Sequence, residues 1–263
     1  LRMTRGNDGF HAQILTAKHS TVYIDPYTFK DQVHYMSFYR DDLKTRHPLD
    51  HFECHVKDEV NEAHSEIAKS FGDCQFRTYD LALACTGEYA QFHGGTVAGA
   101  LAAQVTTMNR VNGIFMRDMS VFMEIVANNN LLIYTNPATD PYTNNDLELM
   151  LAENKTNMEG IIGKANYDLG HVFGTAGGGL AGINVVCFDS REWGATGISQ
   201  PVGDFFDVVY VGHEMGHQFG APHTFNSCEG SGGSSTAYEP GSGTTIMAYA
   251  GLCGTDNITF NTD

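Results

Sequence analysis

The sequence has no long hydrophobic run and few positive charges. No stretch approaches the roughly 18 consecutive apolar residues that a membrane helix requires, and residues 1–20 lack the basic start and apolar run of a signal peptide. Lys and Arg together number 15 against 31 Asp and Glu, so the net charge is −16 at pH 7. Because nucleic acids and anionic membranes repel such a surface, we expect neither as a partner.

The spacing of the cysteines excludes the common small zinc and redox motifs. The six cysteines form no C-x-x-C unit, which zinc ribbons and thioredoxin-like sites require. Their even number favours disulfides in an oxidising compartment, and we therefore predict a secreted protein. The chain begins at Leu1 rather than Met, so we expect a processed or trimmed fragment.

The remaining composition is that of a folded globular protein. Hydrophobic residues make up 42% of the chain, with 16 Phe and 12 Tyr, far from the composition of disordered chains. Strands are expected at 76–84, 120–127, 130–134 and 183–188, and helices at 94–112, 147–164 and 204–219. This alternation, followed by a Gly- and Ser-rich tail, predicts an α/β or α+β domain with a mixed sheet.

One stretch carries the residues of a catalytic metal site. From His213 to His223 the sequence reads H-E-x-x-H-x-x-G-x-x-H. On a helix, His213 and His217 share one face and present two imidazoles to one ion, while Glu214 lies beside it and is free to face a bound water. Gly220 permits a sharp turn after the helix, so that His223 returns as the third ligand. Three protein ligands leave one position of a tetrahedral zinc ion open, which is typical of catalysis.

These residues predict hydrolysis by a zinc-activated water. Zinc lowers the pKa of its water towards about 7, Glu214 takes the proton as the general base, and the hydroxide attacks a peptide carbonyl that the ion polarises. Glu214 then passes the proton to the leaving amine.

The extended motif, together with Thr245-Ile246-Met247-Ala248-Tyr249, resembles the metzincin clan of zinc peptidases. The resemblance implies a twisted mixed sheet, an active-site helix and an irregular C-terminal subdomain. It also implies that Met247 forms the methionine-containing turn beneath the zinc site. Tyr249 matches the position where some metzincins carry a tyrosine that approaches zinc or stabilises the tetrahedral intermediate. The alternative is that Tyr249 only packs.

Within the clan, residues 167–197 resemble the adamalysin or reprolysin pattern, in which this segment is an edge strand that binds substrate. We assign Gly179, Leu180 and Ala181 to that strand. An extended peptide would add to it, main chain to main chain. A Gly-rich loop without this role is the alternative.

Two positions depart from the reprolysin pattern. That pattern has Asp directly after the third His, where this chain has Thr224, and it lacks a tyrosine at the methionine turn. His223-Thr224-Phe225 with Tyr249 instead resembles pappalysins. The chain is therefore most similar to bacterial reprolysin-like peptidases that combine both features, and the resemblance covers roughly Cys74 to Asp263.

The resemblance divides the chain into residues 1–73, a propeptide or its remnant, and residues 74–263, the catalytic domain. Metzincins are commonly made as zymogens, so we expect the N-terminal segment to act as an inhibitor of its own enzyme. A thiolate of Cys54 can occupy the fourth zinc position until cleavage releases it. A disulfide from Cys54 to Cys74 or to another cysteine is the alternative.

Two further predictions concern a disulfide and a second metal. Cys228 and Cys253 flank the same part of the site, and a disulfide between them would hold the loop 229–243. Oxygen ligands of the kind that Ca²⁺ prefers occur in one acidic loop, at Asp140, Asn144, Asn145 and Asp146. A solvated loop without an ion is the alternative there.

Three functions of different classes stay open. The leading hypothesis is a secreted, monomeric zinc endopeptidase that cleaves extended protein or peptide substrates. The second is a catalytically silent metzincin-like binding module, against which the presence of Glu214 argues. The third is a zinc enzyme for a non-peptide amide or ester, which would need a closed pocket in place of an open edge strand.

Overall fold

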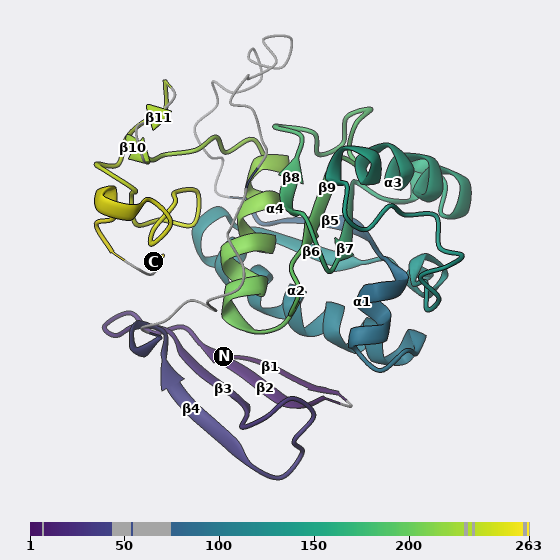
Figure 1. The fold of residues 1–263 in the computed structure, drawn as a ribbon, viewed down its shortest axis with the longest axis horizontal. Coiled ribbons are helices and arrows are strands. Elements are labelled where there is room, and N and C mark those ends of the chain that lie inside the picture. The colour runs from purple at the N-terminus through teal and green to yellow at the C-terminus, as the bar shows by residue number, and fades with distance from the viewer. Residues whose placement is uncertain are drawn as a thin grey trace.

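Two sheets organise the computed structural model, which describes residues 1–6, 8–43, 54, 75–228, 231–232, 235–259 and 262 (Figure 1). The first, which we call the N-terminal sheet, is antiparallel in the order β1-β2-β3-β4. Its strands are β1 (Arg2–Gly6), β2 (Gly9–Ile14), β3 (Val22–Pro26) and β4 (Tyr35–Tyr39), and the short 3-10 helix η1 (Arg40–Asp42) follows. The predicted boundary between residues 73 and 74 lies outside the described residues.

The second sheet has the mixed topology that the sequence predicts. In order across the sheet, its strands are β6 (Val121–Ile125), β5 (Arg77–Cys85), β7 (Leu169–Gly174), β9 (Gly194–Gly197) and β8 (Gly178–Ala181). Neighbouring strands are parallel, except that β8 is antiparallel to β9. The strands expected at 76–84 and 120–127 are confirmed, and the predicted segment 179–181 lies in an edge strand.

Helices cover both faces of the second sheet, because its strands bury alternate side chains on opposite sides. The helices are α1 (Gly87–Phe92) and α2 (Val97–Met119) on one face and α3 (Leu147–Ile161), followed by the 3-10 helix η4 (Lys164–Asn166), on the other. Leu81 and Leu83 of β5 belong to the core under α2. Ala82 and Ala84 belong to the core under α3. The catalytic region is thus a three-layer α/β/α domain, which confirms the predicted fold class.

The predicted helices begin and end at capping residues. The hydroxyl of Thr96 accepts a hydrogen bond from Gly99 N before α2, and the carboxylate of Asp146 accepts one from Leu149 N before α3, both at 3.1 Å. Ser120 ends α2 in the left-handed conformation, with φ of 56°. The helices expected at 94–112 and 147–164 are therefore confirmed, and α2 is longer than predicted.

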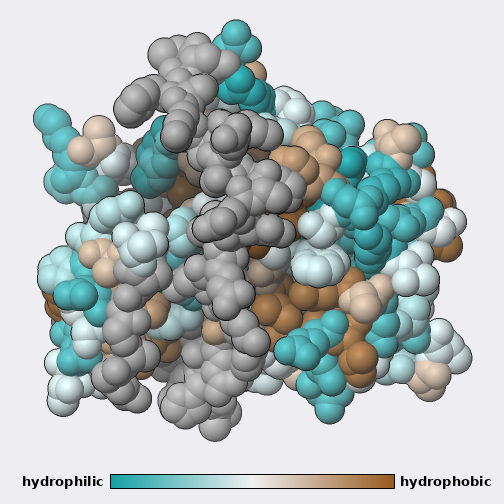
Figure 2. All heavy atoms as spheres, turned by 90° about the horizontal axis from the view of Figure 1, so that it is seen from above, coloured by the Kyte–Doolittle hydropathy of each residue, from teal (hydrophilic) through white to brown (hydrophobic). Residues whose placement is uncertain are grey.

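Hydrophobic side chains also reach the surface. On the face that points upward in Figure 1, they gather in a central area with hydrophilic side chains beside it (Figure 2). On α3, Leu149 and Ile161 are about half exposed. No helix in the described part of the chain is long and apolar enough to cross a membrane.

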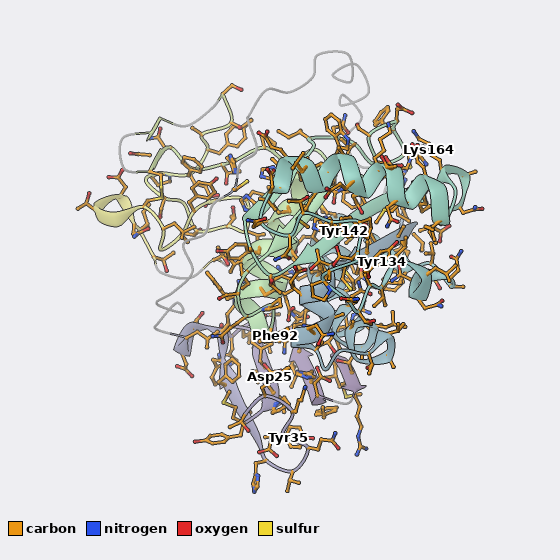
Figure 3. The ribbon with its side chains drawn as sticks, turned by 45° about the vertical axis from the view of Figure 1, so that its right-hand side comes forward. Asp25, Tyr35, Phe92, Tyr134, Tyr142 and Lys164 are labelled. Atoms are coloured by element: carbon orange, nitrogen blue, oxygen red, sulfur yellow. A yellow bond between two sulfur atoms is a disulfide. The ribbon has the colours of Figure 1, made fainter. Side chains whose placement is uncertain are left out.

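The loop between residues 136 and 146 contains neither helix nor strand, as predicted, and its oxygen atoms bind the protein itself. Asp140 accepts hydrogen bonds from Gly87 N and Tyr142 N, both at 2.8 Å. The rings of Tyr134 and Tyr142 meet below α3 in a T-shaped contact at 5.9 Å (Figure 3). Within the described residues, the acidic side chains of this loop form no cluster close enough to hold an ion. A calcium site here stays a prediction.

Residues 130–134 do not form the predicted strand. Part of this segment forms a 3-10 helix, η3 (Asn129–Leu132). At this edge of β5, the side chain of Asn129 makes the hydrogen bonds that a neighbouring strand would otherwise make. Its Oδ1 accepts a hydrogen bond from Leu83 N at 2.7 Å, and its Nδ2 donates to Leu83 O at 2.9 Å. The apolar side chain of Leu132 is fully buried without strand pairing.

The helix expected at 204–219 is formed in two continuous parts, and we call it the active-site helix. A π-helical part, η5 (Phe205–Gly212), leads into α4 (His213–Gln218). Every residue from Phe206 to Gln218 is buried. A helix enclosed on all sides belongs to the interior of a domain.

Residues 183–188 are not the strand that their apolar sequence predicts. Asn184 and Cys187 have positive φ values of 57° and 65°, which interrupt an extended strand. Asn184 N donates a hydrogen bond to His217 O at 3.0 Å, and Val185 N donates one to Gln218 O at 2.9 Å. The segment therefore satisfies carbonyl groups at the end of the active-site helix.

After the active-site helix the chain is irregular, as the metzincin resemblance implies. The short elements described in this region are β10 (Ser227–Cys228), β11 (Ser231–Gly232) and the 3-10 helix η6 (Gly254–Asp256). The predicted disulfide between Cys228 and Cys253 is formed. It joins β10 to the start of η6 and so restricts a region with little regular structure.

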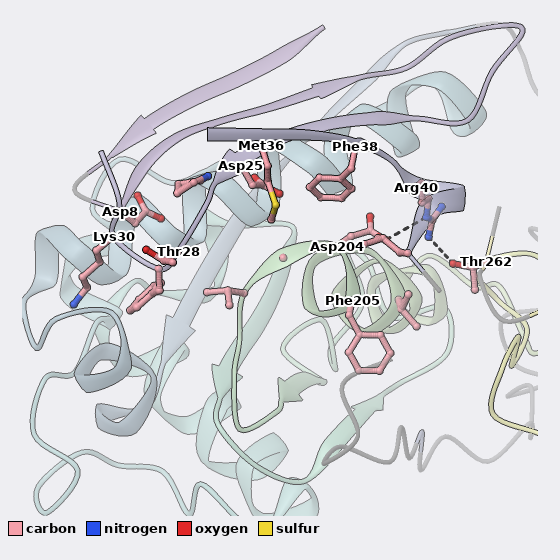
Figure 4. A pocket seen from close by; sticks show the side chains of 16 residues that line it. Asp8, Asp25, Thr28, Lys30, Met36, Phe38, Arg40, Asp204, Phe205 and Thr262 are labelled. Carbon is pink, nitrogen blue, oxygen red and sulfur yellow. Dashed lines mark hydrogen bonds and ion pairs between the residues drawn. The ribbon is translucent and has the colours of Figure 1, made fainter. Parts of the chain in front are cut away.

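The N-terminal sheet contacts the catalytic domain through buried charges. Arg110 of α2 pairs with Asp207 of the active-site helix, with Nη1 and Oδ2 2.9 Å apart, and also with Asp25 of β3. Arg40 Nε lies 3.2 Å from Oδ2 of Asp204, at the start of that helix (Figure 4). We call these five residues the junction network. Through it, the N-terminal sheet is attached to the helix that carries the predicted metal ligands.

A cavity of about 360 Å³ lies beside the junction network, between the N-terminal sheet and the active-site helix (Figure 4). Near it, His11 of β2 lies between two carboxylates, with Nδ1 2.8 Å from Asp25 Oδ1 and Nε2 3.2 Å from Asp8 Oδ2. Burial alone would lower the pKa of His11, but hydrogen bonds and charges from both aspartates raise it to about 9. His11 is therefore a cation at neutral pH.

Candidate active site

Three imidazoles converge at the predicted metal site. His213 and His217 extend from one face of the active-site helix, and His223 approaches from the following segment. Their Nε2 atoms are 3.0 Å apart for His213 and His217 and 3.2 Å apart for each pair that includes His223. Four tetrahedral ligands at the usual Zn–N distance of about 2.0–2.1 Å would lie about 3.3 Å from one another. The spacing of the three nitrogens therefore fits one zinc ion.

The outer nitrogens of two of these rings explain why the inner ones are free to bind a cation. His213 Nδ1 lies 2.6 Å from Ile246 O, and His217 Nδ1 lies 2.7 Å from Ala221 O. A carbonyl oxygen only accepts, so each Nδ1 carries the proton and each Nε2 presents a lone pair. Burial and the neighbouring imidazole lower the pKa of His213 to about 3. Neutral rings with converging lone pairs are the donor set that a metal site needs.

The third imidazole reaches the others because the helix stops at a glycine. Gly220 has a φ of 100°, which the backbone of other residues rarely adopts. The bonds from Gly220 N to His217 O, at 2.8 Å, and from Ala221 N to Gly216 O, at 3.0 Å, close the end of the helix. The chain then turns so that His223 lies opposite the two helical histidines.

Glu214 is fully buried beside the three imidazoles. Its carboxylate lies against the backbone of β8, because a Cβ atom on Gly179 would be 2.0 Å from Glu214 Oε1. Burial raises the pKa of Glu214 to about 8, although a hydrogen bond from Cys54 opposes the shift. A carboxylate whose pKa is raised from its ordinary value towards neutral pH is a stronger base than an exposed glutamate.

Met247 lies directly under the active-site helix. A Cβ atom on Gly216 would be 2.4 Å from Met247 Sδ, so the absence of a side chain at Gly216 allows this close approach. The preceding residue, Ile246, accepts the hydrogen bond from His213 described above. The turn that contains Met247 therefore contacts both the active-site helix and the ring of His213.

Tyr249 lies beside the imidazoles, and it also packs. Its hydroxyl is 3.2 Å from His223 Nε2. Its ring stacks on Phe225 with centroids 4.5 Å apart. Stacking thus holds the ring while the hydroxyl faces the site, and a catalytic role of Tyr249 stays a prediction.

Cys54 joins the three histidines from a distant part of the sequence. Its Sγ lies 3.5 Å from His217 Nε2, and the four candidate ligand atoms all lie within 4.8 Å of one another. Cys54 also forms a parallel bridge with Gly179 of β8. Its thiol is not oxidised, so the alternative of a disulfide at Cys54 is wrong for this structure. Cys74 lies outside the described residues.

The edge strand β8 also lies next to the candidate site. Gly179 pairs with Thr196 of β9, and Ala181 pairs with Gly194. Leu180 is half-buried between them. The strand therefore turns its outer edge towards the segment of Cys54.

A buried network near the site has no evident signal in the sequence. His171 of β7 binds Gln218 Oε1 through Nδ1 and Thr196 Oγ1 through Nε2, both at 2.8 Å. Gln218 Nε2 also donates to Gly170 O at 2.9 Å. Burial lowers the pKa of His171 to about 4, so the ring is neutral. The network attaches the end of the active-site helix to the sheet, but its members are too far apart in sequence to form a motif.

The geometry defines a class of protein: a peptidase-like domain with an H-E-x-x-H helix, a third histidine and a supporting methionine turn. A family model described as metallopeptidase family M12B, reprolysin-like, matches residues 75–262. The chain therefore belongs to this family of zinc metallopeptidases. The match begins just before β5 and leaves the N-terminal sheet outside. No curated protein matches the chain.

Proposed function

We propose that this protein is a secreted zinc endopeptidase that cleaves extended protein substrates and that is held latent by its own N-terminal segment. The observation that carries the proposal is the convergence of three histidine Nε2 atoms within 3.2 Å of one another, next to Glu214 and to the edge strand β8. His213, His217 and His223 are the proposed ligands. Membership of the reprolysin-like family supports the zinc dependence.

Each residue of the site has a different role in the proposed reaction. A bound zinc ion would supply Lewis acidity to a water and to the substrate carbonyl. Glu214 accepts the proton of the attacking water and passes it to the leaving amine. Tyr249 donates its hydroxyl hydrogen to the oxyanion that develops on the carbonyl. Met247 and the Nδ1 hydrogen bonds of the ligands hold the imidazoles in place.

An extended substrate would lie along β8. Peptide backbone can pair with the outer edge of Gly179, Leu180 and Ala181, as a further strand of the sheet. Such pairing uses hydrogen bonds to the substrate backbone, which do not depend on the substrate's side chains. The site would therefore accept many sequences within a protein chain, as an endopeptidase does. The open edge also argues against a small amide or ester as the substrate.

The N-terminal segment, residues 1–73, would keep the enzyme latent. The position of Cys54 Sγ, 3.5 Å from His217 Nε2, supports a thiolate as the fourth zinc ligand in place of water. The bridge from Cys54 to Gly179 covers β8 at the same time. One short segment thus competes both for the ion and for the edge that a substrate needs. The disulfide between Cys228 and Cys253 supports a secreted enzyme, and we expect a monomer.

Zinc content and casein cleavage test this proposal in the full chain, before and after limited proteolysis near residues 54–75. We expect one zinc per chain, no cleavage before the nick and cleavage after it. Cys54→Ala should be active without a nick, and Glu214→Ala should bind zinc but stay inactive. If zinc binds yet no form cleaves protein, the chain is a silent binding module and the peptidase proposal fails.

A further inference from the structure

The residue after the third histidine is unusual for the family pattern, and the structure shows what replaces it. The reprolysin pattern has a carboxylate at position 224, where this chain has Thr224. Glu239, far along the chain, directs its carboxylate to the same place. Its oxygens accept hydrogen bonds from the hydroxyls of Thr224 and Thr245, both at 2.5 Å.

The same carboxylate also binds the backbone of the methionine turn. Glu239 Oε2 accepts hydrogen bonds from Thr244 N at 2.6 Å and from Thr245 N at 3.1 Å. Burial would raise the pKa of Glu239, but these hydrogen bonds and those of the threonine hydroxyls lower it to about 2. Glu239 is therefore an anion under all ordinary conditions, and with a further bond from Thr244 Oγ1 at 3.3 Å its carboxylate accepts from five donors.

Backbone bonds complete the connection to the third ligand. Glu239 N donates to Thr224 O at 2.9 Å, and Thr224 N donates to Met247 O at 3.2 Å. Thr236 Oγ1 donates to the carbonyl of His223 itself, at 2.8 Å. These bonds, together with those of the Glu239 carboxylate, connect three parts of the chain. The parts are the segment before Glu239, the segment of His223 and the methionine turn.

We propose that Glu239 is a positioning residue for the zinc site, which fixes His223 and the turn of Met247 relative to each other. It supplies from a distant point of the chain the carboxylate that the reprolysin pattern carries directly after the third histidine. The inference rests on the proposed function, because it takes His223 to be a zinc ligand. Without the carboxylate, five donors lose their acceptor and the third imidazole loses its fixed orientation.

Zinc affinity of the full chain tests the proposal without any measurement of activity. Glu239→Gln should bind zinc about 10- to 100-fold more weakly than the wild type in competition with a chelator, the range for loss of a group that orients a metal ligand. The matched control is Glu124→Gln, the same change at an exposed position of β6, which should bind zinc like the wild type. Thermal unfolding of both zinc-free variants is measured in parallel, so that any loss of stability in Glu239→Gln can be compared with its loss of zinc affinity.

A second carboxylate at position 224 provides the rescue. Thr224 Oγ1 lies 3.3 Å from Thr245 Oγ1, so an aspartate there would bring a carboxylate to the Thr245 hydroxyl of the methionine turn. Thr224→Asp combined with Glu239→Gln should therefore recover most of the lost zinc affinity.

The outcomes separate this inference from the proposed function. Wild-type affinity in Glu239→Gln overturns the positioning role alone. An affinity loss matched by an equal loss of stability in the zinc-free protein, with no rescue by Thr224→Asp, also overturns it, because Glu239 would then only support the fold. A wild type that binds no zinc overturns the proposed function together with this inference.

Discussion

Two polar clusters lie along the active-site helix, and they differ in how their charge is balanced. Near the start of the helix, the junction network sets Arg40 and Arg110 against Asp25, Asp204 and Asp207, so that opposite charges meet within the protein. Further along the same helix, three neutral imidazoles direct their lone pairs to one point. The first cluster has its cations and anions within the protein, whereas the second needs a cation from outside.

The comparison teaches that burial has different consequences in the two places. In the junction network, removal of one partner leaves another charge buried without compensation, which is costly to the fold. At the imidazoles, burial keeps the rings neutral, and removal of a functional group affects chemistry more than folding. Each prediction below separates a loss of stability from a loss of function.

The largest effect is expected at Glu214, on activity alone. Glu214→Ala should lower kcat/KM of the nicked enzyme by about 10²- to 10⁴-fold, the usual contribution of a general base. Zinc content should stay at the wild-type level, because the three imidazoles are unchanged. Kinetics on a peptide substrate with metal analysis of the same sample checks this. Normal cleavage by the variant would remove Glu214 from the mechanism.

The next effect is expected at Arg110, on stability. Arg110→Ala should lower the free energy of unfolding by about 3–5 kcal/mol, because Asp207 and Asp25 lose their buried partner. Urea unfolding followed by circular dichroism measures it. Arg117→Ala is the control, since Arg117 pairs with Asp118 on the surface and should cost about 0–1 kcal/mol. Equal effects of the two changes would show that the junction network does not hold the sheet.

A smaller effect is expected at Gly179, again on activity. In Gly179→Ala the new methyl group would meet Glu214 Oε1 at 2.0 Å and must displace it. A shift of about 1 Å in a catalytic group can cost on the order of 10²-fold in rate. Gly160→Ala in α3 is the matched control, because nothing lies within 4 Å of its new methyl group. Comparison of kcat, with zinc content measured in parallel, checks the result, and unchanged kcat in Gly179→Ala contradicts it.

The smallest effect is expected at His11, and it depends on pH. The pKa of His11 is raised to about 9 in the folded state, by Asp25 and Asp8 against the effect of burial. Its stabilising contribution is therefore fully present below pH of about 6.5, the ordinary histidine pKa, and is lost as pH rises through about 9.

The measurement compares unfolding free energies of wild type and His11→Gln between pH 6 and pH 10. The difference should be on the order of 2 kcal/mol at pH 6 and should shrink towards pH 10. His34→Gln, at an exposed histidine just before β4, serves as the control. A difference that does not change with pH would mean that His11 contributes by packing and not by charge.

Local patterns predicted the parts of the molecule in which neighbours in sequence are neighbours in space. The helix of His213 and His217, the turn at Gly220 and the strand β5 follow from spacing and residue type alone. The disulfide between Cys228 and Cys253 was also predicted, because both cysteines flank the same motif.

Predictions failed where a distant partner decides the local structure. Residues 130–134 do not form the expected strand, because the Asn129 amide binds the backbone of Leu83. Residues 183–188 do not form the expected strand either, because their backbone amides bind carbonyl groups at the end of the active-site helix. The junction network could not be predicted either, since its partners lie far apart along the chain. The role of Glu239 could not be predicted because the chain between Thr224 and Thr245 is largely irregular, so that no periodicity shows which side chains meet. The departure at Thr224 was the one signal that pointed towards Glu239.

The enclosure of the active-site helix limits how this enzyme can be altered. Because every residue from Phe206 to Gln218 is buried, a larger residue at most of these positions would disturb a packed neighbour. A protein engineer who seeks a new cleavage preference should therefore leave this helix unchanged. Variation is better tolerated at exposed positions after Tyr249, such as Thr255 and Ile258, which can be diversified in a library.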